Sequence, residues 1–380
     1  MFNALYSLIG IPFGYLMYLI YGICHNYALS IIVFTVITKL LLFPVNYKTQ
    51  KSAARMQLLN PKLEKIRKSF ANNNTRIQEE TQKLYQEEGI NPMASCLPAL
   101  IQMLLLFGVI DVVYKPITHI LRFSKGIRQA AFKIADGLVN GKGDFKALRS
   151  ELTILDQVHK NPDKFTGITG GFLKKVTEFN DNYTLFGANL GKTPSLHPSS
   201  WTNEAVILAI IPFAAGLAQL LVSIYSQYHQ KKTNPDMQGG GCMAVMMYLM
   251  PILSIVWAFA LPAGIGFYWI WSSVFSFLIT YGLNCYFTTE RTVKINEKEK
   301  EKARIYAEKH PNKKTFMQRM LEQQAELERQ QNGGKSGSGG EKKSRSEMNK
   351  QNREKLKEAR KRFAEKYGEV YDDADDENDD

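Results

Sequence analysis

Five apolar runs constrain the fold of this 380-residue chain more than any other feature of its sequence. About 20 apolar residues cross the hydrocarbon of a bilayer, and in lipid every backbone polar group must be paired within the protein. The runs are therefore expected to be helices, and the sequence predicts an all-α membrane protein. The five predicted transmembrane helices cover residues 28–46, 97–116, 203–228, 244–260 and 264–287.

A lysine, Lys39, lies well inside the first apolar run. A charge at the centre of a membrane helix costs about 2.5–3.5 kcal/mol on insertion scales, so such a residue usually has a function. The alternative is a side chain that snorkels to the inner end of its helix. Asp111 in the second span is the obvious counter-ion, but the helix rise places the two charges roughly 10 Å apart in depth. We therefore expect Lys39 to lack a resident carboxylate partner.

Polar side chains recur every three or four residues along several spans, which places each set on one side of its helix. Small and hydroxyl residues of this kind also occur where membrane helices simply pack together. Their convergence with Lys39 favours a hydrated groove over a dry helix interface. The expected groove residues are Lys39, Thr35, Thr38, Gln102, Gln219, Ser223, Trp269, Ser273, Ser276 and Thr280.

Lysine and arginine near the span ends set the predicted orientation, because cytoplasmic loops carry the excess of positive charge. The segment 47–95 carries nine basic residues, whereas the turns at 24–27 and 261–263 carry none. We therefore expect the amino terminus outside and the carboxyl terminus in the cytoplasm. The predicted organisation is an outer interfacial amphipathic helix (1–25), a first span (26–47), a cytoplasmic helical hairpin (48–95), a second span (96–116), an extracytoplasmic helical insertion (117–202), a third span (203–228), a cytoplasmic loop (229–243), a fourth span (244–260), a fifth span (261–288) and a basic cytoplasmic tail with an acidic end (289–380).

The aromatic-rich start favours a helix in the interface, with a cleaved signal or a sixth span as the alternatives. In the hairpin, the spacing predicts helices of about 20 and 14 residues separated at residues 72–74. Thr75 with Gln78 predicts a capping box at the start of the second helix.

The net charge is +12, and the part of the tail at 290–371 carries 23 basic against 14 acidic residues before the acidic end. A basic tail suits an anionic lipid surface or ribosomal RNA, and a solvated disordered segment is the equal alternative. The four cysteines, at 24, 96, 242 and 285, have no metal-ligand spacing, so neither a disulfide nor a metal is expected. The sequence has no phosphate-binding loop and suggests no nucleophile–base pair. We expect no cofactor, no DNA partner and no enzymatic activity.

The sequence resembles the YidC/Oxa1/Alb3 membrane protein insertases in three runs, which are IGIPFGYLMYLIYGICHNYALSIIVFTVITKLLLFPVNYKTQKS (9–52), GINPMASCLPALIQM (89–103) and MMYLMPILSIVWAFALPAGIGFYWIWSS (246–273). The resemblance implies the five-span core of the Gram-positive type in a bacterial cell membrane. It places the family's positive residue, often an arginine, on Lys39, its groove threonine on Thr35, its span-three glutamine on Gln219 and its last-span aromatic on Trp269. It also implies nascent membrane proteins, the lipid bilayer and the Sec translocon as partners.

These observations together predict a membrane protein insertase and chaperone. A groove open to the cytoplasm would receive a hydrophilic segment, and Lys39 would attract acidic residues in the substrate's tail. A secondary transporter for an anionic solute is the alternative, although that class predicts internal repeats that the sequence does not show. A third class is a ribosome anchor that acts through the basic tail alone.

Overall fold

The computed structural model describes residues 2–71, 73–90, 97–139, 141, 144–233 and 241–309, and within these ranges the side chains of 2–9, 97–99, 233, 241–248, 250 and 306–307 are left aside. The regular secondary structure of the described chain is helical except for one short antiparallel hairpin, in which β1 (Thr184–Leu185) pairs with β2 (Ala188–Asn189). The predicted all-α fold is confirmed. The tail beyond residue 309 and its predicted helices lie outside the described residues.

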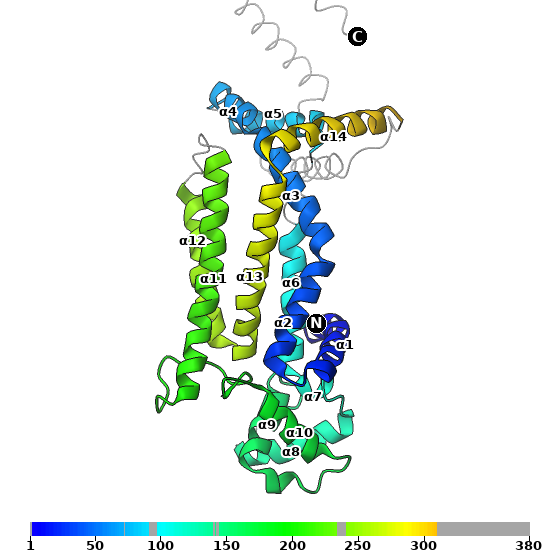
Figure 1. Ribbon diagram of the computed structural model, residues 1–380, viewed down its shortest axis with the longest axis vertical. Coiled ribbons are helices and arrows are strands. Elements are labelled where there is room, and N and C mark those ends of the chain that lie inside the picture. The colour runs from blue at the N-terminus through cyan, green and yellow to red at the C-terminus, as the bar shows by residue number, and fades with distance from the viewer. Residues whose placement is uncertain are drawn as a thin grey trace, which may run out of the picture. The chain divides into compact units, whose positions relative to one another are not determined.

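The apolar helices of the described chain run side by side (Figure 1), namely α2 (Tyr27–Leu41), α6 (Leu97–Tyr114), α11 (Asn203–Thr233), α12 (Gly241–Ala260) and α13 (Ala263–Tyr286). The more polar α3 (Phe43–Leu58) continues from the end of α2. Among the described residues, α11 and α13 are each long and apolar enough to cross a membrane, and the pair α2–α3 is a third candidate. The described apolar parts of α6 and α12 are shorter, at 100–114 and 251–260. The count of five spans therefore remains a prediction.

The first predicted span is two helices rather than one. Helices α2 and α3 meet at Leu42 with a bend of 55°. Pro44 lies in the first turn of α3, where proline has no N–H to donate and its ring clashes with a preceding carbonyl in a continuous helix. The bend redirects the chain, so that α3 continues the first span into the charged hairpin.

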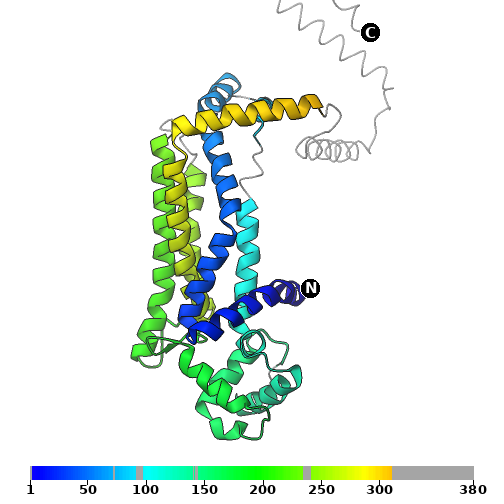
Figure 2. The same cartoon turned by 45° about the vertical axis from the view of Figure 1, so that its right-hand side comes forward.

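Helix α1 (Phe2–Cys24) crosses α2 and α6 instead of running alongside them (Figure 2). Gly10 and Gly14 allow this close crossing. A Cβ atom at Gly10 would lie 2.1 Å from Oδ2 of Asp111, and one at Gly14 would lie 2.1 Å from Nδ1 of His119. Met17 and Ile20 continue the buried face of α1 towards its carboxyl end.

The insertion at 117–202 is helical, as the sequence predicts, and has a densely packed core. It contains α7 (Pro116–His119), α8 (Lys125–Val139), α9 (Ser150–Lys160), a 3-10 turn η2 (Pro162–Phe165), α10 (Phe172–Asn182) and the β-hairpin. Its buried aromatic residues belong to the same hydrophobic cluster as buried apolar residues of α1, α2 and α6. Backbone bonds from Ala263 N to Lys192 O (2.9 Å) and from Gly264 N to Leu190 O (2.8 Å) join the insertion to the start of α13.

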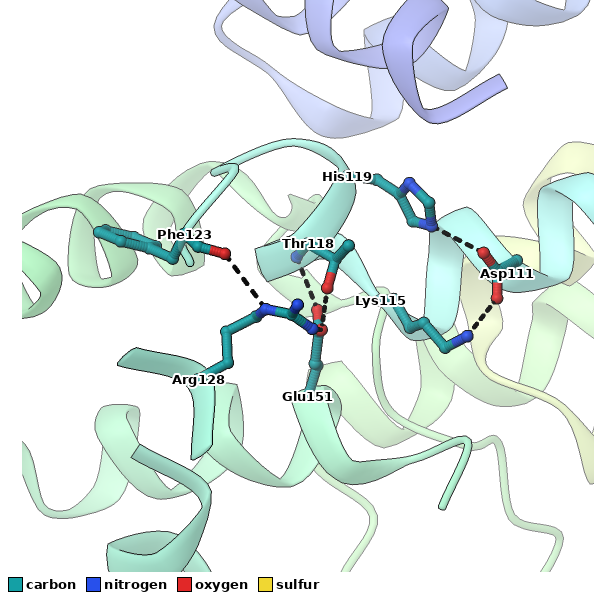
Figure 3. A network of polar contacts seen from close by, with 7 residues as sticks. All are labelled: Asp111, Lys115, Thr118, His119, Phe123, Arg128 and Glu151. Carbon is teal, nitrogen blue, oxygen red and sulfur yellow. Dashed lines mark hydrogen bonds and ion pairs between the residues drawn. The ribbon is translucent and has the colours of Figure 1, made fainter. Parts of the chain in front are cut away.

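Two buried carboxylates fix the insertion to α6 (Figure 3). Asp111 accepts bonds from Lys115 Nζ at 2.5 Å and pairs with His119 Nε2 at 2.7 Å. Glu151 of α9 accepts bonds from the Thr118 amide (2.9 Å), the Thr118 hydroxyl and Arg128 Nη1 (3.0 Å). Each carboxylate is therefore satisfied where it is buried, as burial of a charge requires.

The charged hairpin differs in detail from the prediction. Its first helix is split at Leu59 into α3 and α4 (Asn60–Ser69), because Pro61 lies in the first turn of α4. The second, α5 (Asn74–Glu87), has the predicted 14 residues. The capping prediction at Thr75 is wrong, since the Asn73 side chain accepts the bond from the Arg76 amide at 3.0 Å. A small apolar core of Leu59, Leu63, Leu84 and Ile90 holds the hairpin together.

The tail begins as helix α14 (Thr289–Lys309), which lies across the end of α3 (Figure 1). The buried Glu88 joins α14 to the hairpin, since its carboxylate pairs with Lys62 at 2.7 Å and Lys300 at 3.3 Å and accepts a bond from Asn296 at 3.3 Å. Burial opposes ionisation of Glu88, yet the bonds from Lys62, Asn296 and Lys300 outweigh it and hold its pKa below the ordinary value. Arg55 adds bonds to Asn296 Oδ1 and Glu88 O, both at 2.8 Å.

Substitution of Gly10 tests the close crossing of α1. We expect Gly10→Ala to lower the free energy of unfolding by about 1–3 kcal/mol, because Asp111 is tethered and cannot move away from the added methyl group. The matched control is Gly22→Ala, where a Cβ meets nothing within 4 Å and alanine favours the helix. Thermal unfolding in detergent measures both, and equal stability of the two variants contradicts the crossing.

Substitution of Glu88 tests the junction between α14 and the hairpin. Because the folded pKa is depressed, the ionised carboxylate stabilises the fold above its unfolded pKa, and this contribution is lost as pH falls through the folded value. Glu88→Gln should cost about 1 kcal/mol at neutral pH, and its stability should converge with that of the wild type below pH 4.5.

Hydrogen exchange of α14, corrected for intrinsic rates, measures the effect of Glu88→Gln. Glu79→Gln is the matched control, since Glu79 is exposed on α5, and its effect should stay within about 0.5 kcal/mol. Equal protection of α14 in both variants at neutral pH would show that Glu88 does not hold the tail helix.

Candidate functional site

A polar cavity of about 400 Å3 lies among α2, α3, α6, α11 and α13. It is bounded by both halves of the bent pair α2–α3, so the bend at Leu42 shapes its wall. Most of its polar lining comes from α3 and α13. The lining residues are Lys39, Leu42, Val45, Asn46, Thr49, Gln50, Ile101, Gln102, Gln219, Val222, Ser272, Ser273, Ser276, Ile279, Thr280 and Leu283.

Lys39 sits in the last turn of α2 and is 6% exposed. Its Nζ atom donates a hydrogen bond to Ser276 Oγ of α13 at 2.8 Å. No carboxylate among the described residues forms an ion pair with Lys39, and Asp111 instead pairs with Lys115 and His119. An ammonium has three N–H donors, so a single hydroxyl leaves it able to bind an anionic or strongly polar group.

Further polar bonds continue along the cavity. Ser273 Oγ donates to Gln219 Oε1 at 3.1 Å, which links α13 to α11. Towards the hairpin, Gln50 donates to Asn284 Oδ1, and the Asn284 amide donates to the Tyr225 hydroxyl at 3.4 Å. These side chains have polar partners across three helices, so the cavity is held open by hydrogen bonds as well as by apolar packing.

The structure brings together six of the ten predicted groove residues. Lys39, Gln102, Gln219, Ser273, Ser276 and Thr280 all line the polar cavity. They come from four helices that are far apart in sequence. Their common location supports the inference that the polar stripes converge on Lys39.

The other four predicted groove residues lie outside the cavity lining. Thr35 and Thr38 are buried, and their hydroxyls donate back to carbonyls of α2, to Ile31 O at 2.6 Å and to Phe34 O at 2.9 Å. Such local bonds satisfy the hydroxyl within its own helix. Trp269 packs against the main hydrophobic cluster, and Ser223 is half-buried on α11. Contact of these four with a substrate stays a prediction.

Thr49 and Gln50 also line the cavity, although the sequence places them in the predicted hairpin. The helical spacing of the sequence does indicate that Gln50 lies on the same side as Lys39. Lys39, Leu42, Asn46 and Gln50 follow one another at intervals of three or four residues, which keeps them on one side despite the bend. Only the continuation of the first span into α3 shows that this side faces the cavity.

Metal ligands do not gather anywhere in the described part of the chain, where no group of three or more His, Cys, Asp or Glu residues could hold an ion. Cys24 and Cys285 are free thiols. Cys96 and the side chain of Cys242 lie outside what the structure describes.

Comparison with known proteins gives a family match over most of the chain. The family described as 60Kd inner membrane protein matches residues 19–291. Three similar proteins, each named membrane protein insertase YidC, come from Pelodictyon phaeoclathratiforme (24% identical, 69% of this chain and 34% of that protein), Prosthecochloris aestuarii (25%, 68% and 33%) and Rickettsia prowazekii (28%, 72% and 38%). The chain thus spans little more than a third of the length of these relatives.

Cysteine labelling tests whether the polar cavity is wet. The background is a variant with the four native cysteines replaced by serine. We expect a water-soluble maleimide to label Thr280→Cys at least about tenfold faster than Leu278→Cys. The reason is that a thiol reacts as its thiolate, which forms readily in water and not in lipid. Thr280 lines the cavity, whereas the Leu278 side chain is 55% exposed on the outside of α13. Equal labelling rates in proteoliposomes would contradict an aqueous cavity.

Proposed function

The chain belongs to the 60Kd inner membrane protein family, and on that premise we propose that it is a membrane protein insertase. Its family and its apolar helices give it a membrane location. The name of the relatives, membrane protein insertase YidC, supports this proposal. The function consists of inserting integral membrane proteins and helping them to fold, with no covalent chemistry.

The observation that carries the proposal is the buried ammonium of Lys39 beside the polar cavity, with no carboxylate partner among the described residues. An isolated charged residue at the centre of a bilayer costs about 2.5–3.5 kcal/mol. A cavity that offers water and hydrogen bonds at intermediate depth lowers this cost for a hydrophilic segment that must cross. The substrates are nascent membrane proteins.

Lys39 attracts an acidic residue in the substrate's tail, and Ser276 holds the ammonium on the cavity side of α2. Gln102, Gln219 and Thr280 supply exchangeable hydrogen bonds to the polar segment. The substrate's apolar helix then leaves the groove for lipid, driven by burial of its side chains in hydrocarbon. Because Lys39 is a lysine, it acts as a point charge and not as a bidentate clamp.

The proposed orientation is that of a multi-pass protein in a bacterial plasma membrane. The amino terminus lies outside and the hairpin, the 229–243 loop and the tail lie in the cytoplasm, as the basic residues of these segments favour. The cavity then opens to the cytoplasm. The basic tail is proposed to bind ribosomes, and the Sec translocon is proposed as a partner on the basis of the family.

Substitution of Lys39 tests the role of its charge. In liposomes, we expect Lys39→Ala to slow insertion of a single-span substrate with an acidic tail about tenfold, because one attractive charge pair in a partly desolvated site is lost. Lys39→Arg should retain most of the rate. A substrate with a neutral tail should distinguish the variants much less.

The matched control is Lys48→Ala, which removes the same charge from an exposed position of α3 outside the cavity lining. Equal insertion by wild type, Lys39→Ala and Lys39→Arg would remove the charge from the mechanism. Uptake of an anionic solute by the same liposomes, without insertion of any substrate, would favour a secondary transporter instead.

A further inference from the structure

Arg122 occupies an unusual place between the insertion and α1. It has a backbone φ of +55°, a conformation that residues other than glycine rarely adopt. Its guanidinium carbon lies 5.4 Å from the centre of the Tyr15 ring and 5.1 Å from that of Tyr18. Both distances are within the range of a cation–π interaction. Two tyrosines of α1 thus hold the guanidinium on the surface of that helix.

The charge of Arg122 has no carboxylate partner in the part of the chain that the structure describes, and the residue is exposed. Its neighbours differ in this respect, since Lys115 pairs with Asp111 and Arg128 pairs with Glu151 (Figure 3). A guanidinium that lies over aromatic rings keeps N–H donors at its edge for a planar or tetrahedral oxyanion. Arg122 is therefore positioned by the two tyrosine rings and still has N–H donors available for a ligand.

The surface beside Arg122 is apolar. Ile11, Tyr15, Tyr18, Leu19 and Ile23 are between 39% and 82% exposed, and their spacing places them on one face of α1. The opposite face is buried against α2 and α6. Since α1 crosses helices of a membrane protein (Figure 2), its exposed apolar face suits contact with lipid chains.

We propose that Arg122, Tyr15 and Tyr18 form a binding site for the phosphate of one phospholipid, whose acyl chains lie along the exposed face of α1. The guanidinium binds the phosphodiester oxygens, and the apolar face explains why the occupant is a lipid rather than a free phosphate ion. The proposal rests on the membrane location and not on the insertase function.

Native mass spectrometry of the full chain in detergent, titrated with phosphatidylglycerol, tests the site. The variant is Arg122→Gly, because glycine tolerates the positive φ and so removes the guanidinium without adding backbone strain. We expect its apparent affinity for the first bound lipid to fall about tenfold, as for the loss of a charge-assisted hydrogen bond. The affinity of Arg122→Lys should lie between those of the wild type and Arg122→Gly.

Arg149→Ala is the matched control, because it removes one exposed arginine of the insertion that bonds to Thr193 and has no contact with a ring of α1. Its affinity should stay within about twofold of the wild type. The site is overturned if Arg122→Gly binds lipid like the wild type, or if both variants weaken binding equally, which indicates non-specific attraction. Displacement of the lipid by inorganic phosphate at equal concentration also overturns it, in favour of a free-anion site.

Discussion

The buried ammonium of Lys39 is the constraint on which the polar side of the membrane helices depends. A buried charge is stable only with polar groups beside it. Ser276 on α13 accepts a hydrogen bond from Lys39 Nζ at 2.8 Å. That bond joins α2 to α13. The polar stripe of α13, with Ser273 and Thr280, lines the same cavity as Gln219 and Gln102.

The described chain treats its buried carboxylates and its unpaired cations differently. Asp111, Glu151 and Glu88 are buried, and each is bonded to several donors from other elements. Such groups fix positions, because removing a partner leaves a charge unsatisfied. Lys39 and Arg122 instead lack carboxylate partners in the described chain. Our proposals place binding at these two cations, and fixed geometry at the paired carboxylates.

The bend between α2 and α3 shows how a local sequence signal acquires its meaning from the fold. Pro44 was visible in the sequence, yet a proline in a membrane helix is tolerated and does not by itself predict a break. The structure bends there by 55°. As a result, Gln50 lines the cavity instead of belonging only to the hairpin. Pro61 acts in the same way between α3 and α4.

The sequence by itself determined the helical fold, the apolar character of the bundle, the isolated lysine and the separation of Lys39 from Asp111. These follow from composition and helical period, which are local properties. The tertiary structure decided which stripe residues share a cavity, since Thr35 and Thr38 satisfy their hydroxyls within α2 while Ser276 reaches Lys39. It also decided that Arg122 lies over Tyr15 and Tyr18. Partners more than 100 residues apart meet only through packing, and no local pattern specifies that packing.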